Sequence, residues 1–258
     1  MEHFTRKIIS VHSFRGGTGK SNIVANLAVT IALQGYRVGI VDTDIQSPGI
    51  HVLFNFDSSN AEYSLNDYLW ERCPIEKAAY DVSYVMEKNG VQTDGKVYLI
   101  PSSLRVNEIT KILREGYDVG LLNEGFQQLL EVLNLDYLLI DTHPGINEET
   151  LLSITISDLL LLILRPDQQD FQGTAVTVDI ARQLEVPEMF LIVNKVPSSY
   201  EIEAIKQKVE QAYNVPIAGI LPLSEQIIEL GSSDIFCLRF PHNPVVNTIK
   251  NIAKISMN

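Results

Sequence analysis

The chain has 258 residues, of which 45% are hydrophobic, so it can bury a sizeable core and is not globally disordered. Its formal net charge of −12 argues against a protein whose whole surface binds nucleic acid or anionic membranes, although a local basic patch is compatible with it. The two cysteines, Cys73 and Cys237, form no Cys-x-x-Cys pair, and we interpret them as free thiols in a reducing compartment.

Short apolar runs alternate with longer helical patterns along the chain. The first half predicts, in order, a strand at 7–12, a helix at 21–35, a strand at 37–42, a loop at 43–54, a polar helical region, and strand-like segments at 80–87 and 96–103. The second half predicts a helix at 123–134, strands at 136–141, 158–166, 189–196 and 215–222 with helices between them, and a final helix after Pro244.

The predicted strands are continuous apolar runs, which is typical of a parallel sheet that is covered on both faces. We therefore predict an α/β fold with a doubly wound, mostly parallel sheet, helices on both faces, and a single domain at 1–258. The segment 1–14 has no signal-peptide core or cleavage site, and no apolar stretch approaches the roughly 18 residues of a membrane span. We expect a cytoplasmic protein.

The segment "SFRGGTGKSN" at 13–22 is similar to a phosphate-binding loop. Gly19, Lys20 and Ser21 fit its Gly-Lys-Ser/Thr ending, but Phe14 stands at the first glycine position and Arg15 follows it. Backbone N–H groups in such a turn, together with the N-terminus of the next helix, form a cradle for anions. The alternative is a chance glycine-rich turn, but a strand before it and an amphipathic helix after it favour the phosphate loop.

Acidic residues follow two of the predicted strands. Asp42 and Asp44 come at the end of the strand at 37–42, and Asp141 ends the strand at 136–141 after four apolar residues. Ligands of doubly wound proteins bind beyond the carboxyl ends of the strands, and a carboxylate at that place is the Walker B arrangement for Mg²⁺. The alternative is that these carboxylates only cap the turns that follow.

Five motifs together resemble the MinD/ParA family of deviant Walker A P-loop ATPases. They are "RGGTGKSN", "GIVDTDIQSP" with its two aspartates, the Walker B strand "YLLIDTHPGI", "FLIVNKV" and the late loop "GILPLSE". The resemblance extends from Lys7 to about Pro222 and is weaker over 240–253. It implies a SIMIBI-like P-loop NTPase that binds ATP and Mg²⁺. The motif "NKV" lacks the following aspartate with which GTPases select guanine, which favours ATP.

The resemblance also implies roles for individual residues. Arg15 stands where the family has a signature lysine that crosses a dimer interface to the partner's phosphates, and its planar fork suits phosphate oxygens. Arg15 would then act as an arginine finger; the alternative is a solvated loop residue and a lost contact. Asp44 would orient the attacking water, and Asp42 would support Mg²⁺ through water. Asn194 would contact adenine, or it is an ordinary asparagine in a turn.

The predicted site therefore has three groups of residues. The predicted catalytic residues are Arg15, Lys20 and Asp44. The predicted nucleotide contacts are Gly16, Gly17, Thr18, Gly19, Lys20, Ser21, Asn22, Asn194 and Pro222. The predicted metal ligands are Ser21, Asp42 and Asp141. His12 and His143 lie next to the site in the sequence and are assigned no role.

The function that the resemblance implies is an ATP-dependent dimerisation switch. In the ATP state it would be a homodimer, with slow hydrolysis stimulated by a partner protein, and it would position division machinery, DNA or other cargo. The alternative is a regulatory nucleotide-binding scaffold with little hydrolysis. A metal-cluster carrier is disfavoured by the missing Cys-x-x-Cys pair. The net charge gives no support to a membrane or nonspecific DNA surface as the site of action.

The last helical pattern, after Pro244, carries an apolar stripe with lysines on its other side. The stripe comprises Val245, Val246, Ile249, Ile252 and Ala253. A membrane-surface helix is one interpretation, but the segment has no Trp or Phe anchor and the net charge opposes approach to an anionic surface. We predict instead that it packs on the protein's own sheet, and that removal of residues 245–258 lowers thermal stability and solubility.

Overall fold

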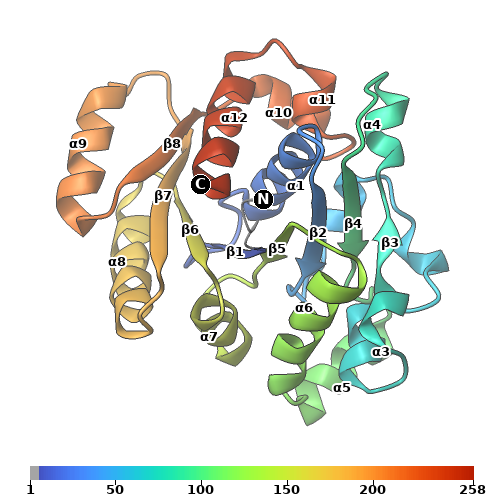
Figure 1. Ribbon diagram of the computed structural model, residues 1–258. Helices are drawn as coiled ribbons and strands as arrows, with labels where there is room; N and C mark the ends of the chain where they lie inside the picture. Colours follow the sequence, from blue (N-terminus) through green and yellow to red (C-terminus); the bar gives the residue numbers. More distant parts are fainter. Residues whose placement is uncertain (1–5) are drawn as a thin grey trace.

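A single mixed sheet forms the centre of the protein in the computed structural model, which describes residues 6–258 (Figure 1). Its eight strands are β1 (Lys7–His12), β2 (Arg37–Asp42), β3 (Tyr80–Asp81), β4 (Lys96–Ile100), β5 (Tyr137–Asp141), β6 (Leu159–Leu164), β7 (Glu188–Val196) and β8 (Ile217–Pro222). Their order is β3-β4-β2-β5-β1-β6-β7-β8, and every neighbouring pair is parallel except the antiparallel pair β3–β4. The predicted doubly wound, mostly parallel α/β fold is confirmed.

Helices cover both faces of this sheet, as Figure 1 shows. On one face lie α1 (Lys20–Ala32), α2 (Ile50–Leu53), α4 (Tyr84–Lys88), α10 (Glu225–Leu230), α11 (Phe236–Arg239) and α12 (Pro244–Met257). On the other lie α3 (Leu65–Leu69), α5 (Val106–Glu115), α6 (Gly120–Val132), α7 (Glu148–Thr155), α8 (Gln168–Gln183) and α9 (Ile202–Tyr213). Successive strand residues point to opposite faces: Ile8 packs in one core and Ile9 in the other. The strands are therefore apolar throughout because both faces are buried.

One predicted strand is wrong over most of its length. The segment 80–87 was expected to be strand-like, but only β3 is extended and α4 begins at Tyr84. The Asp81 carboxylate accepts a hydrogen bond from the Ser83 backbone N–H at 2.8 Å, which turns the chain after two residues. Val82, Val85 and Met86 are then buried at helical spacing. The predicted loop at 43–54 likewise contains the short helix α2.

The C-terminal helix α12 packs against α1 and β8, so the prediction that it belongs to the core is confirmed. All five residues of its apolar stripe are 5% exposed or less. The contact is close at Gly219 of β8, where a Cβ atom would lie 2.8 Å from Ile252 Cδ1. Within residues 6–258 we find no helix that combines the length and the apolar character needed to span a membrane.

Ile252→Ala is expected to lower the free energy of unfolding by about 2–4 kcal/mol, because Ile252 is 1% exposed and its truncation leaves a cavity between α12 and the sheet. Lys254→Ala, on the exposed side of the same helix, is the control and is expected to change stability little. Urea unfolding of both variants measures the difference. Equal stability of the two variants, with liposome binding lost in Ile252→Ala, would instead indicate a membrane-surface helix.

Candidate nucleotide-binding site

The glycine-rich loop connects the carboxyl end of β1 to the first turn of α1, the place at which doubly wound folds bind ligands. Two of its glycines are in the left-handed region, Gly17 with φ 76° and Gly19 with φ 99°. Gly19 also lies against β7, and a Cβ atom there would be 2.6 Å from Asn194 Nδ2. Both the backbone conformation and the close approach therefore require glycine at position 19.

Lys20 is the first residue of α1 and is only 7% exposed. Its Nζ lies 3.3 Å from Ser13 Oγ, which also accepts a hydrogen bond from Thr18 Oγ1 at 2.9 Å. Burial lowers the pKa of Lys20, while the nearby carboxylates Asp141, Asp44 and Asp42 oppose that shift. A cation is thus held inside the loop, as predicted, whereas the predicted nucleotide contact Thr18 directs its hydroxyl to the loop itself.

Asp42 and Asp141 occupy matching positions at the ends of the adjacent strands β2 and β5. Both are buried, with exposed fractions of 0% and 1%. Burial raises the pKa of Asp141 to about 6. It also raises the pKa of Asp42 well above its usual value, and the neighbouring charges of Asp141 and Asp44 add to the shift. Two buried carboxylates so close together are stabilised in their ionised form by a cation that compensates their charge.

The acids fit a bound Mg²⁺ ion. The Oδ1 atom of Asp141 is buried and has no hydrogen-bond partner among residues 6–258, while a hydrogen bond from Ser21 lowers the pKa of the same carboxyl. The described part of the chain holds no group of three His, Cys, Asp or Glu residues that would enclose a metal. An ion at this place would therefore take few protein oxygens, as Mg²⁺ does when phosphates and water complete its shell. Ser21 and Asp141, with Asp42 behind them, would hold it.

Asp141→Asn is expected to stabilise the nucleotide-free protein at pH 7.5. The raised pKa of Asp141, about 6 against 3.8, means that the folded state binds this proton more tightly than the unfolded chain. The free energy of unfolding therefore falls as the pH rises from about 4 to about 6, and the deficit at pH 7.5 is on the order of 2–3 kcal/mol.

Asparagine keeps the volume of the side chain and removes its charge. The gain in the free energy of unfolding is therefore expected at pH 7.5 and becomes smaller towards pH 5. Thermal unfolding of both proteins without Mg²⁺ at the two pH values measures it. Asp179→Asn, at a carboxylate whose side chain is 71% exposed, is the control and is expected to show no comparable gain. A gain that is the same at both pH values would contradict this account.

A cavity of about 630 Å³ lies beside the loop and the acids. Of the predicted residues it is lined by Gly16, Gly17, Gly19, Lys20, Ser21, Asn22, Asp44, Asn194 and Pro222. Asp42 and Asp141 lie buried next to it and do not line it. Its lining also has an apolar part, which includes Leu53, Leu223, Ile227 and Phe236. Leu223 belongs to the motif "GILPLSE". The other three were not predicted, because only the packing of α2, α10 and α11 brings them together.

Asn194 holds β7 against the loop. Its Nδ2 donates to the Thr18 carbonyl at 2.8 Å, and its Oδ1 accepts from the Lys195 backbone N–H at 2.9 Å. Lys195, which was not predicted, donates from Nζ to the Gly17 carbonyl at 2.7 Å and lines the cavity. Asn194 is therefore at the edge of the cavity, with both ends of its amide engaged by the protein.

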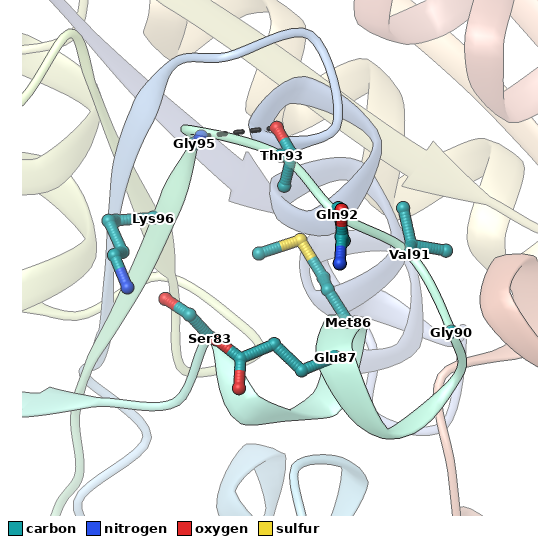
Figure 2. Close-up of a pocket in the computed structure, with 9 residues that line it drawn as sticks. All are labelled: Ser83, Met86, Glu87, Gly90, Val91, Gln92, Thr93, Gly95 and Lys96. Carbon is teal, nitrogen blue, oxygen red and sulfur yellow. Dashed lines mark hydrogen bonds between the residues drawn. The ribbon is translucent and has the colours of Figure 1, made fainter.

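A second hollow, of about 370 Å³, lies apart from these residues between α4 and the start of β4 (Figure 2). Ser83, Met86, Glu87, Thr93 and Lys96 are among the residues around it. It contains none of the predicted site residues, and no buried polar atom without a partner lies on its lining. The predicted site residues therefore lie at the cavity beside the glycine-rich loop and not at this second hollow.

A family model described as "ParA: NUBPL iron-transfer P-loop NTPase" matches residues 5–256, almost the whole chain. The chain belongs to the ParA/MinD family of P-loop NTPases. An uncharacterized ATP-binding protein of Methanocaldococcus jannaschii is 26% identical, over 95% of this chain and 85% of its own length. An iron-sulfur cluster carrier protein of Aquifex aeolicus is also 26% identical, over 98% of this chain and 69% of its own length.

Solved structures of ParA/MinD proteins share the fold. The septum site-determining protein MinD of Pyrococcus horikoshii, complexed with Mg-ADP, superposes with a TM-score of 0.77 at 21% identity, over 97% of this chain and 96% of its own. That match shows the fold, and the cavity beside the glycine-rich loop is the candidate nucleotide site of this ParA/MinD NTPase.

The ParA/MinD signature position holds Arg15, which does not line the cavity of its own chain. Its side chain is 40% exposed, and its guanidinium lies 3.5 Å from Asp170 Oδ1 and 3.7 Å from Asp167 Oδ1, at the start of α8. The Asp170 carboxylate also binds Arg165, with 2.9 Å between Oδ2 and Nε. Arg15 therefore forms ion pairs with the start of α8 and lies outside the cavity of its own chain.

Phe14 fills the position of the first Walker glycine by packing on α8. A Cβ atom on Gly173 would lie 2.1 Å from the Phe14 ring, so this contact depends on glycine at position 173. The ring remains 36% exposed. The departure from the standard loop is therefore accommodated by a second glycine about 160 residues away, which no local pattern around Phe14 could indicate.

Asp44 and His143 face each other across the cavity wall, with 3.8 Å between Asp44 Oδ1 and His143 Nε2. The same carboxyl oxygen accepts from the Ser47 backbone N–H at 3.1 Å. His12, in contrast, is fully buried behind the loop and hydrogen-bonded through Nδ1 to Thr142 Oγ1 at 2.7 Å. Burial lowers the pKa of His12 to about 3, so it is neutral and structural.

Proposed function

We propose that this ParA/MinD protein is an ATP-dependent dimerisation switch that hydrolyses ATP slowly and is stimulated by a partner protein. The observation that best supports it is the division of charges around the cavity: Lys20 and Asp44 line it, while Arg15 lies outside it, half-exposed and paired with acids of α8. An intersubunit cation at that place offsets the repulsion between two phosphate sites that face each other. The switch would act in the cytoplasm.

In this proposal each residue has a stated task. Asp44 accepts a hydrogen bond from the attacking water and orients it, and Lys20 binds the oxygens of the terminal phosphate. Mg²⁺, held through Ser21 and Asp141, would neutralise charge on the phosphates. The apolar part of the cavity lining, at Leu53, Leu223, Ile227 and Phe236, would bind the adenine base, with Asn194 and Pro222 beside it.

Two other functions are less well supported. A regulatory scaffold with little hydrolysis would not need Asp44 beside Lys20, to which we assign the attacking water. An iron-sulfur cluster needs thiolate ligands, and Cys73 and Cys237 belong to different hydrophobic cores. Burial raises the pKa of each thiol to about 11, which disfavours the thiolate. The names of the carrier relatives therefore do not extend to this chain.

Arg15→Ala is expected to keep the ATP affinity of the monomer within a few-fold, because Arg15 does not line the cavity of its own chain. It is expected to lose ATP-induced dimerisation, because the contact to the partner's phosphates is removed along with the part-exposed ion pairs to Asp167 and Asp170. Light scattering with Mg-ATP measures the dimer, and phosphate release measures turnover. Arg15→Lys restores the usual residue of the family and is the control, with dimerisation retained. Normal dimerisation of Arg15→Ala would make Arg15 a bystander and would favour the scaffold.

The surface on which the switch acts is tested separately. Co-sedimentation with anionic liposomes and with nonspecific DNA, each with and without ATP, distinguishes the two kinds of surface. The net charge of −12 and the buried apolar face of α12 predict little binding to either at physiological salt, so that positioning would depend on a protein partner.

A further inference from the structure

The loop that carries Asp44 is fixed mainly through its backbone. The carboxylate of Asp42 accepts hydrogen bonds from the backbone N–H groups of Asp44, at 3.1 Å, and Gly49, at 3.3 Å. The Thr43 N–H donates to the Asp141 carbonyl at 3.0 Å. These contacts place the Cα atom of Asp44, but they leave the rotation of its carboxyl group open.

Two described groups approach that carboxyl within 4 Å, both at its Oδ1 atom, and the charge of Lys20 acts on it from further away. One is the Ser47 N–H at 3.1 Å and the other is His143 Nε2 at 3.8 Å. No described residue donates a hydrogen bond to Oδ2. The protein therefore approaches the carboxyl group at Oδ1, and Oδ2 is available to a water molecule in the cavity.

His143 is itself held in place. Pro144 follows it and restricts its backbone to extended conformations, and its carbonyl accepts a hydrogen bond from Thr150 Oγ1 at 3.4 Å. Its Nδ1 atom is buried and has no hydrogen-bond partner among the described residues. A buried polar atom without a partner lowers stability. The ring position is explained if the other nitrogen has a task at Asp44.

We propose that His143 is a positioning residue for ATP hydrolysis: its Nε2–H donates to Asp44 Oδ1 and fixes the rotation of the carboxyl group that orients the attacking water. A carboxylate only accepts, so the nitrogen that faces it carries the hydrogen. The gap of 3.8 Å closes to a hydrogen bond when the nucleotide is bound, as catalytic contacts commonly do. Burial raises the pKa of Asp44, and the neighbouring His143 opposes that shift.

This inference rests on the proposed function, because it requires that Asp44 orients the water. It adds a link between two loops that are about a hundred residues apart in the sequence, one after β2 and one after β5. Both loops meet at the ATP site, so a change in one is transmitted to the other through this contact.

The experiment compares His143→Ala, His143→Gln and the double variant His143→Ala/Asp44→Ala with the parent. His143→Ala is expected to lower kcat by about 10- to 100-fold, the effect of losing one hydrogen bond to a charged group. The Kd of a fluorescent ATP analogue is expected to stay within about two-fold of the parent value, and the thermal midpoint within a few degrees. His143→Gln, whose Nε2 can donate, is expected to recover most of the rate.

The double variant is expected to be no slower than Asp44→Ala, because His143 acts through Asp44. His242→Ala, an exposed histidine outside the site, is the matched control. Provided that Asp44→Ala is slow, two results would overturn the role of His143: a normal kcat in His143→Ala, or a kcat in the double variant that is lower than in Asp44→Ala. A parent protein without hydrolysis, or a normal rate in Asp44→Ala, would overturn the proposed function and this inference with it.

Discussion

Lys20→Ala is expected to abolish ATP binding, with affinity reduced by about 100-fold or more. Lys20 is the cation buried next to Asp42, Asp44 and Asp141, and its Nζ already lies within the loop that would hold the phosphates. Its removal loses a charge-assisted contact and leaves the three carboxylates to repel the polyphosphate. Isothermal titration calorimetry with Mg-ATP measures the loss.

Lys195→Ala provides the matched control, because Lys195 also lines the cavity but its ammonium donates to the Gly17 carbonyl at the rim. We expect this variant to weaken binding by about ten-fold at most. Circular dichroism shows whether both variants are folded. ATP affinity that is unchanged in folded Lys20→Ala protein would refute the assignment of this cavity.

Asp44→Ala is expected to bind ATP, to hydrolyse it about 10²- to 10⁴-fold more slowly, and to accumulate as a dimer. Asp44 lines the cavity and its carboxyl is half-buried, whereas the buried acids Asp42 and Asp141 lie beside the predicted metal position. Loss of Asp44 therefore removes the group that orients the water and leaves the nucleotide contacts in place.

Gel filtration of the variant in Mg-ATP is expected to show a dimer that persists for longer than that of the parent, while phosphate release falls. Asp118→Ala, far from the cavity in the loop before α6, serves as a control with normal turnover. A monomeric Asp44→Ala protein with a normal rate of phosphate release would refute both the role of Asp44 and the coupling of hydrolysis to dissociation.

The parts of the site that were predictable are those with a local pattern. The glycines and Lys20 depend on a short loop between a strand and a helix, and Asp42 and Asp141 depend on strand ends that a parallel sheet brings together. Their roles in binding and catalysis remain predictions. The apolar part of the cavity lining, such as Phe236, was not predictable because it forms only when distant helices pack together.

Other features were missed for a similar reason. The pair of Asp44 and His143 joins two loops whose positions depend on the sheet order, and the contact of Arg15 with Asp170 depends on where α8 begins. The error at 80–87 has a different origin: the β-branched and aromatic residues there favour a strand, but Val82, Val85 and Met86 also have the spacing of a buried helical face, and the hydrogen bond from Ser83 to Asp81 turns the chain into the helix. Strand propensity alone could not resolve that competition.

The packing of α12 on α1 has a consequence for the order of events during synthesis. The helix that follows the phosphate loop is made early, yet the surface that covers it lies about two hundred residues further along the chain. Until residues 244–257 have left the ribosome, the side of α1 that α12 covers stays exposed to chaperones and proteases. The nascent chain therefore completes its ATP site late, although it begins to build that site with its first strand and helix.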